Sequence, residues 1–303
     1  MHPRLGLALT LTVTASLLTD TRAIAHPGSG IVVTSAGDVY FVDNSPPPPE
    51  GTGRETVWKI SRDGALTAST TGGGHWLAND AADTFANVDL NRWFQQRISP
   101  NLVRVTRSDF RPGLIAADGQ PFVFNRDGNL YYAKGNVELT RLTPQGKSSP
   151  VLSNMIVQAD RLGGIKGIAC GPDGTLYLTY PRAVQKITLD GHASMLAEGI
   201  EIPGCGHPAD PAISGPYLRG LAVGSDGSIY AAASNCRAVL KIAPKGTITK
   251  FLNSDPWIPT GVALAGGAVY VLEFDDAPPD RWRPRVRKIA PDGTITVLAT
   301  INR

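Results

Sequence analysis

Short runs that alternate apolar and polar residues recur along the chain, and each of them follows a turn glycine. The clearest examples are residues 38–42, 129–132, 175–178, 228–231 and 268–271. Alternation with a period of two, bounded by glycine turns, is typical of β-hairpins. The 33 glycines and 24 prolines among 303 residues agree with many short strands joined by tight turns. The pattern therefore predicts an all-β chain.

A second pattern, a basic residue followed by isoleucine, marks a later strand of the same repeat. It occurs as Lys59-Ile60, Lys186-Ile187, Lys241-Ile242 and Lys288-Ile289, with Arg141-Leu142 as a variant, and a turn glycine follows each copy. The interval between the first two of these glycines, Gly64 and Gly146, is close to twice the later intervals. One repeat without the phrase is therefore expected between them, with strands at 75–79, 84–88 and 103–105 and a closing strand at 114–117.

Six repeats of roughly 40–50 residues, each with four strands, predict a six-bladed β-propeller built from four-stranded antiparallel blades. The expected blades cover residues 30–70, 74–117, 120–153, 164–198, 218–252 and 259–300 of a single domain, 26–303. A β-sandwich is the alternative, but it does not explain five copies of the basic-isoleucine phrase.

Residues 1–25 have the pattern of a cleavable signal peptide. Arg4 supplies the charged start, residues 5–18 the apolar core, and Ala23-Ile24-Ala25 the small-residue cleavage site. The apolar run is shorter than the roughly 20 residues that a membrane span needs, which disfavours an anchor. We therefore expect a secreted or periplasmic protein without a membrane partner.

Charge and cysteine content narrow the picture further. A formal net charge of +3 is small for this length, so we expect no nucleic-acid partner, and we expect a monomer. Cys205 and Cys236 both lie in expected loops, and export favours a disulfide between them over two unpaired thiols. Cys170 lies in an apolar run and is expected to be a buried thiol.

One face of the expected propeller carries the long connections. In a four-stranded meander, the second-to-third and the blade-to-blade connections share a face, and the long segments 44–55, 90–101, 198–217 and 274–284 all fall there. Binding residues concentrate on loops held by a rigid scaffold. Around the axial mouth on this face, the inner strands begin at Ser29, His75, Gln120, Lys166, Arg219 and Thr260, and the second strands end at Asp43, Asp89, Lys134, Tyr180, Asn235 and Glu273. One side of the mouth is thus expected to be acidic and the other basic.

The repeated phrases resemble the NHL-repeat and gluconolactonase-like (senescence-marker, SMP-30-type) six-bladed propellers over residues 30–300. The best local matches are residues 204–212, 219–231 and 235–242. This resemblance implies a metal at the axial mouth, held by an acid, an amide and an aspartate. The chain lacks the family's acidic opening on the first inner strand and the Asn-Gly phrase before its central ligand.

The main hypothesis is a divalent cation held by Asp43, Asp89 and Glu273, with Asn235 or Asn44 as a neutral ligand. Oxygen ligands favour Ca²⁺, with Zn²⁺ or Mn²⁺ as alternatives. Lys166 and Arg219 would orient a small polar or anionic substrate, and a metal-polarised carbonyl with a general base suffices for lactone or ester hydrolysis. The structural alternative is that Asp43 and Asp89 only cap turns.

Two other functions stay open. The chain could be a non-catalytic module that binds a protein or glycan through the same loops, where residues 281–285 combine arginines with a tryptophan. It could also be a lyase with His75 as general base, although a lone histidine in a loop more often only satisfies a hydrogen bond.

Overall fold

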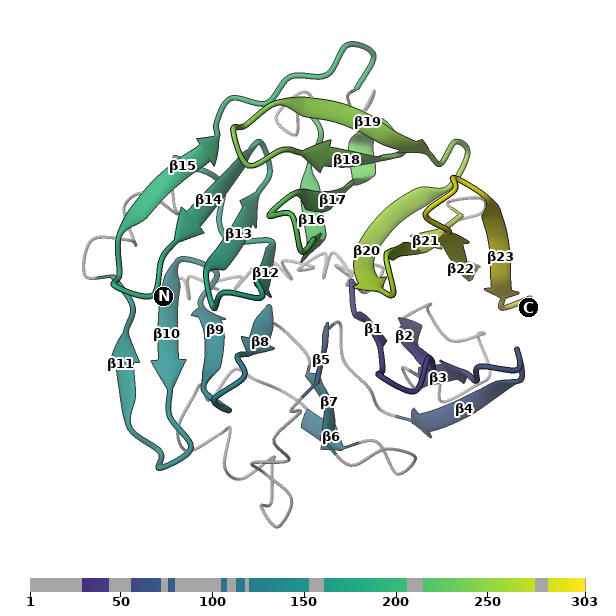
Figure 1. Ribbon diagram of the computed structural model, residues 1–303, viewed down its shortest axis with the longest axis horizontal. Coiled ribbons are helices and arrows are strands. Elements are labelled where there is room, and N and C mark those ends of the chain that lie inside the picture. Colours follow the sequence, from purple (N-terminus) through teal and green to yellow (C-terminus); the bar gives the residue numbers. More distant parts are fainter. Residues whose placement is uncertain are drawn as a thin grey trace, which may run out of the picture.

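A computed structural model of the chain describes residues 29–43, 56–71, 76–79, 105–107, 113–117, 120–152, 161–205, 215–275 and 283–302. In these ranges the chain forms short antiparallel strands and one short 3-10 helix, η2 (Ser234–Cys236). The sheets stand around a central axis as in a propeller (Figure 1). Within the described ranges, no helix has the length and apolar character needed to cross a membrane.

Five sheets are complete four-stranded blades, and in each the strands follow one another from the axis outward. Blade one comprises β1 (Ile31–Val33), β2 (Val39–Asp43), β3 (Thr56–Ile60) and β4 (Leu66–Thr71). Blade three comprises β8 (Phe122–Phe124), β9 (Leu130–Lys134), β10 (Glu138–Leu142) and β11 (Ser148–Pro150). Blade four comprises β12 (Gly167–Cys170), β13 (Leu176–Tyr180), β14 (Ala183–Ile187) and β15 (Ala193–Ala197). Blade five comprises β16 (Leu218–Val223), β17 (Ile229–Ala233), β18 (Ala238–Ile242) and β19 (Ile248–Asn253). Blade six comprises β20 (Ile258–Ala265), β21 (Ala268–Phe274), β22 (Pro284–Ile289) and β23 (Ile295–Thr300).

The prediction of six four-stranded blades is wrong in its count, because the described residues form five. A three-stranded sheet takes the place of the expected second blade, between blades one and three. Its strands are β5 (Trp76–Asn79), β7 (Leu114–Ala117) and β6 (Val105–Arg107), in that order. Leu114–Ala117 was predicted to close the blade on the outside, yet it pairs directly with the inner strand β5. Leu114, Ile115 and Ala116 are buried, which suits the middle of a sheet better than its edge. The strand predicted at 84–88 lies outside the described residues.

The repeated sequence phrases have one structural cause. In all five blades the tyrosine of the second strand faces the basic residue of the third strand: Tyr40 and Lys59, Tyr131 and Arg141, Tyr177 and Lys186, Tyr230 and Lys241, and Tyr270 and Lys288. The ammonium lies 5.4 Å from the ring centre in the Lys241 pair and 5.7 Å in the Lys288 pair, which is cation–π geometry. The isoleucine or leucine that follows is buried in every copy. Each phrase therefore supplies one core residue and one cross-strand contact.

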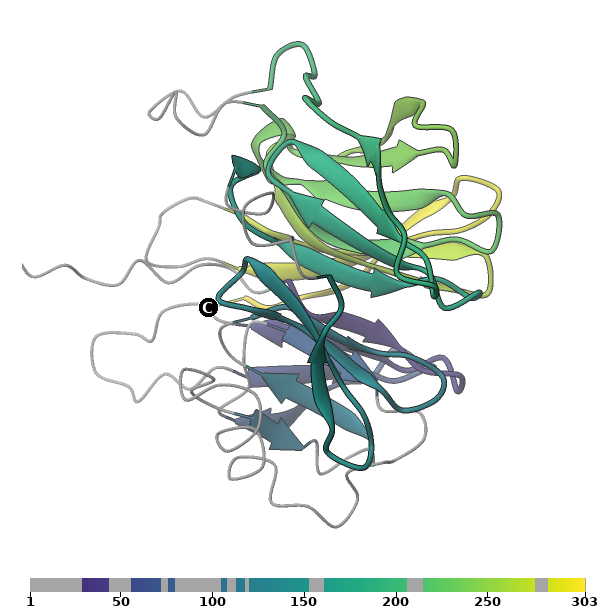
Figure 2. The same cartoon turned by 90° about the vertical axis from the view of Figure 1, so that its left-hand side faces the viewer.

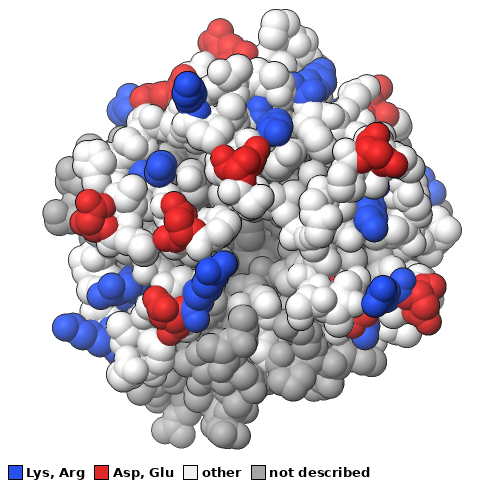
Figure 3. Space-filling model, in the orientation of Figure 1, with Lys and Arg blue, Asp and Glu red and all other residues white. Residues whose placement is uncertain are grey.

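The two faces of the ring differ as expected. In Figure 2 the tight hairpin turns of the blades lie on the right, so Figures 1 and 3 view the molecule from that side. The inner strands contact one another in a closed ring, from β1 through β5, β8, β12, β16 and β20 back to β1. The starts of these strands and the ends of the second strands meet at the opposite side, which we call the loop face.

Candidate ligand site at the axial mouth

Glycines bring the inner strands into close contact at the loop face. A Cβ atom on Gly167 would lie 2.5 Å from the carbonyl oxygen of Arg219, one on Gly220 2.8 Å from that of Thr260, and one on Gly261 2.4 Å from that of Ser29. Only glycine allows backbones to approach this closely. The residues that precede these glycines and Gly30 therefore lie next to one another around the axis. We call this set, Ser29, Lys166, Arg219 and Thr260, the collar.

A short sequence phrase marks the collar. A glycine, an apolar residue and an alanine follow the collar residue in three blades, at 167–169, 220–222 and 261–263. This phrase sets the close approach of the strands, and so it marks the mouth.

Two collar residues are cations that face no described acid. The ammonium of Lys166 lies 5.7 Å from the centre of the Tyr217 ring. Burial lowers the pKa of the Arg219 guanidinium, while Tyr217 opposes this change, and an arginine remains charged under such conditions. Within the described part of the chain, no carboxylate forms an ion pair with Lys166 or Arg219. The basic side of the mouth expected from the sequence is therefore present in blades four and five.

Tyr217 is held in an unusual backbone conformation beside these cations. Its φ is 46°, in the left-handed region, where a bulky residue costs about 1–3 kcal/mol. The Ser234 amide donates to the Tyr217 carbonyl over 3.2 Å, and the Leu218 amide donates to the Pro181 carbonyl over 3.0 Å. The turns after the second strands of blades four and five thus fix the Tyr217 backbone.

A disulfide fastens the same region. Cys205 and Cys236, the pair expected from their position in loops, are joined with a Cα–Cα distance of 4.5 Å. Cys236 belongs to η2, the helix that begins with the Ser234 that binds Tyr217. Cys170 is a free, half-buried thiol, and burial raises its pKa, so it is poorly suited to nucleophilic chemistry.

Polar oxygens without partners lie at the same level of the ring. The Ser29 hydroxyl and the Gln120 side-chain carbonyl oxygen are buried and have no hydrogen-bond partner in the described part of the chain. Buried polar atoms normally have a partner, so these two are available to a ligand or a water molecule. Tyr180, by contrast, donates its hydroxyl hydrogen to Gln185 over 2.8 Å, and burial raises its pKa, so it has a structural role.

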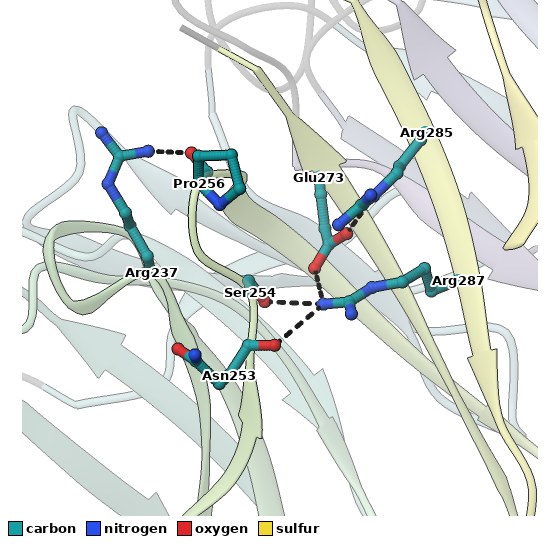
Figure 4. Close-up of polar contacts among 7 residues, drawn as sticks. All are labelled: Arg237, Asn253, Ser254, Pro256, Glu273, Arg285 and Arg287. Atoms are coloured by element: carbon teal, nitrogen blue, oxygen red, sulfur yellow. Dashed lines mark hydrogen bonds and ion pairs between the residues drawn. The ribbon is translucent and has the colours of Figure 1, made fainter. Parts of the chain in front are cut away.

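The acidic side of the mouth differs from the prediction in blade six. Glu273 has no exposed surface, and its two carboxylate oxygens accept hydrogen bonds from Arg285, over 2.7 Å, and from Arg287 (Figure 4). Arg287 also donates to the Ser254 hydroxyl over 3.0 Å, and the Arg285 guanidinium stacks 4.0 Å from the Trp257 ring. Two residues after Glu273, Asp275 forms an ion pair with Arg283. Three arginines thus more than neutralise these two acids.

The predicted cation ligands do not come together in the described structure. Both oxygens of Glu273 already accept from guanidinium groups, which compete with a metal ion for the same lone pairs. Asp43 is 2 % exposed and accepts a hydrogen bond from the Trp58 indole over 3.2 Å, and Asn235 lies in η2. Among the described residues, no three histidine, cysteine, aspartate or glutamate side chains could hold a metal ion. Asp89, Asn44 and His75 lie outside the described residues, and so do Arg281 and Trp282 of the predicted arginine–tryptophan segment.

Comparison with known proteins supports the architecture. No protein-family model matches the chain, and no curated protein matches it by sequence. Among solved structures, the chain is similar to a calcium-binding protein, regucalcin from Agrobacterium tumefaciens str. C58, with a TM-score of 0.50 and 14 % identity over 81 % of each chain. It is also similar to virginiamycin B lyase from Staphylococcus aureus, with a TM-score of 0.47 and 16 % identity over 89 % of this chain and 83 % of that one. A gluconolactonase from Xanthomonas campestris has a TM-score of 0.36 and 14 % identity over 56 % of this chain and 71 % of that one. The likeness to regucalcin, at 14 % identity, shows the β-propeller fold alone.

Proposed function

We propose that this protein binds a small anionic ligand at the axial mouth, with the ligand's carboxylate or carbonyl oxygen on Lys166 and Arg219. The observation that carries the proposal is that these two cations lie on adjacent blades without a described carboxylate partner. A cationic mouth lined by partly buried walls attracts anions more strongly than an open surface does. The Ser29 hydroxyl and the Gln120 oxygen support a ligand that also carries hydroxyl groups, because both can accept hydrogen bonds.

The same arrangement supports hydrolysis of a lactone or ester as the activity. When water attacks such a carbonyl, negative charge develops on its oxygen, and fixed cations stabilise that charge. The Lys166 ammonium lies over the Tyr217 ring, and Arg219 belongs to the inner strand β16, so the backbones of both cations are part of the ring of inner strands or directly precede it. A divalent cation would polarise the carbonyl further, but we assign no step to it, because Glu273 is occupied by arginines.

We also propose that the protein acts outside the cytoplasm, as a monomer. The Cys205–Cys236 disulfide supports an oxidising compartment, in agreement with the signal-peptide pattern of residues 1–25.

Titration calorimetry with gluconate tests the binding step. We expect saturable binding that weakens at least tenfold in Lys166→Gln and in Arg219→Gln, because each variant loses a charge-assisted hydrogen bond. Lys245→Gln, an exposed lysine in a turn on the opposite face, is the control and should bind as the parent does. Equal affinity in all four proteins would refute the site.

A pH-stat assay with gluconolactone and simple esters tests the activity. Proton release that is lost in Arg219→Gln and kept in Lys245→Gln is the expected result. Binding without turnover would leave a ligand-binding propeller, and the absence of both would favour a module for proteins or glycans.

A further inference from the structure

A pocket lies between blades three and four, on the tight-turn side of the ring and away from the axial mouth. Its volume is about 210 Å³. Blade three contributes Tyr131 and Arg141, and blade four contributes Leu176, Leu189 and Asp190. The walls thus combine apolar side chains with one cation.

Leu189 departs from the chain's own pattern. It stands at the first central position of the turn after the third strand, where three other blades have proline: Pro144, Pro244 and Pro291. Proline fits this turn position because its fixed φ matches the turn. Leu189 is instead 70 % exposed, so a large apolar side chain is left in water at the edge of the pocket. Nothing in the turn itself requires leucine.

Arg141 is the second departure, because the other four blades have lysine at this position. In blades one and five the equivalent lysine pairs with an aspartate of the first turn, Lys59 with Asp38 at 2.9 Å and Lys241 with Asp226 at 3.8 Å. In blade three the aspartate at the position of Asp226 is Asp127, whose carboxylate accepts a hydrogen bond from the Asn125 amide. Within the described residues no carboxylate forms an ion pair with Arg141, which lies opposite Tyr131.

The acid at the pocket does not neutralise Arg141. Asp190 accepts a hydrogen bond from the Thr188 hydroxyl of its own turn. The pocket therefore presents a guanidinium that interacts with the Tyr131 side chain but has no described carboxylate partner, next to two leucines. A guanidinium binds a carboxylate through two parallel hydrogen bonds, and the leucines and the ring match an apolar body.

We propose that this pocket binds a small amphipathic carboxylate, with its carboxylate on Arg141 and its apolar part between Tyr131, Leu176 and Leu189. The two residues that break the internal repeat line the same pocket. This second site is independent of the axial mouth.

Phenylacetate and its neutral analogue phenylacetamide test the proposal, with binding followed by two-dimensional NMR of the mature protein. We expect phenylacetate to saturate below roughly 10 mM and to bind at least tenfold more tightly than phenylacetamide. Arg141→Gln should remove this preference. Leu189→Pro, which restores the turn of the other blades, should weaken binding several-fold and keep the melting temperature within a few degrees.

Lys241→Gln, at the equivalent position of blade five, is the matched control and should bind phenylacetate as the parent does. Three results would overturn the proposal. They are no saturable binding of phenylacetate, equal affinity for phenylacetamide, or unchanged binding by Arg141→Gln.

Discussion

Glu273→Gln isolates the buried ion cluster of blade six. The substitution keeps the shape of the side chain and removes its charge. A carboxylate can accept from Arg285 on one oxygen and from Arg287 on the other, as Figure 4 shows. A glutamine has only one oxygen, so its amide hydrogens would face one of the two guanidinium groups. Arg287 would keep Ser254 as a neutral partner, but its charge would stay buried without a counter-charge.

The expected cost follows from this burial. Removing one partner of a buried ion pair costs about 3–5 kcal/mol, because the remaining charge is uncompensated. Glu201→Gln is the matched control, since Glu201 pairs with Arg182 but its side chain is 80 % exposed. An exposed pair contributes about 0–1 kcal/mol.

Urea denaturation gives the free energy of unfolding for both variants. We expect Glu273→Gln to lower it by about 3 kcal/mol and Glu201→Gln to lower it by less than about 1 kcal/mol. Similar small losses in both variants would refute the reasoning, because Glu273 would then be free for another role, such as binding a cation.

Three further predictions concern the scaffold and the mouth. Gly261→Ala should lower the free energy of unfolding by at least about 2 kcal/mol, because its Cβ would lie 2.4 Å from the Ser29 carbonyl oxygen. Gly293→Ala is the control: its φ is +85° but no atom lies near the added Cβ, so it should cost only about 1 kcal/mol. Equal losses of unfolding free energy in the two variants would count against the close strand contacts of the collar. The double variant Cys205→Ser, Cys236→Ser should lower the free energy of unfolding by about 2–4 kcal/mol, which thermal melts check. It should also weaken gluconate binding in titration calorimetry, because the disulfide supports the turn that binds Tyr217. Unchanged gluconate binding would contradict this role of the disulfide. Hydrogen bonds from Thr175 and Ser228 hold the pKa of Asp173 and Asp226 below the usual 3.8, so the stability they add is present above that pH and is lost as the pH falls through their lowered pKa values. Asp173→Asn with Asp226→Asn should therefore lose less stability than the parent between about pH 5 and about pH 3, and parallel curves would contradict this.

The architecture could be predicted wherever the repeat is local. Each tyrosine and each basic residue lie on adjacent strands of one hairpin, so pairs such as Tyr230 and Lys241 leave a regular trace in the sequence. The sheet of β5, β6 and β7 lacks this pair, and no local pattern indicates that Leu114–Ala117 would join the inner strand. The predicted number of four-stranded blades was wrong for that reason.

The site was predictable in position but not in charge balance. The register places Lys166 and Arg219 at the mouth because each starts an inner strand. Glu273 also lies where expected, but its partner Arg285 follows a long connection between β21 and β22. A tight turn fixes strand register, whereas a long loop does not, so the pairing could not be read from the sequence.

A crystal structure of the protein soaked with gluconate tests the central claim most directly. The account predicts electron density for the ligand at the collar, with a carboxylate oxygen within hydrogen-bond distance of the Lys166 ammonium and the Arg219 guanidinium. Density for gluconate elsewhere on the molecule, with the collar holding only water, would contradict it.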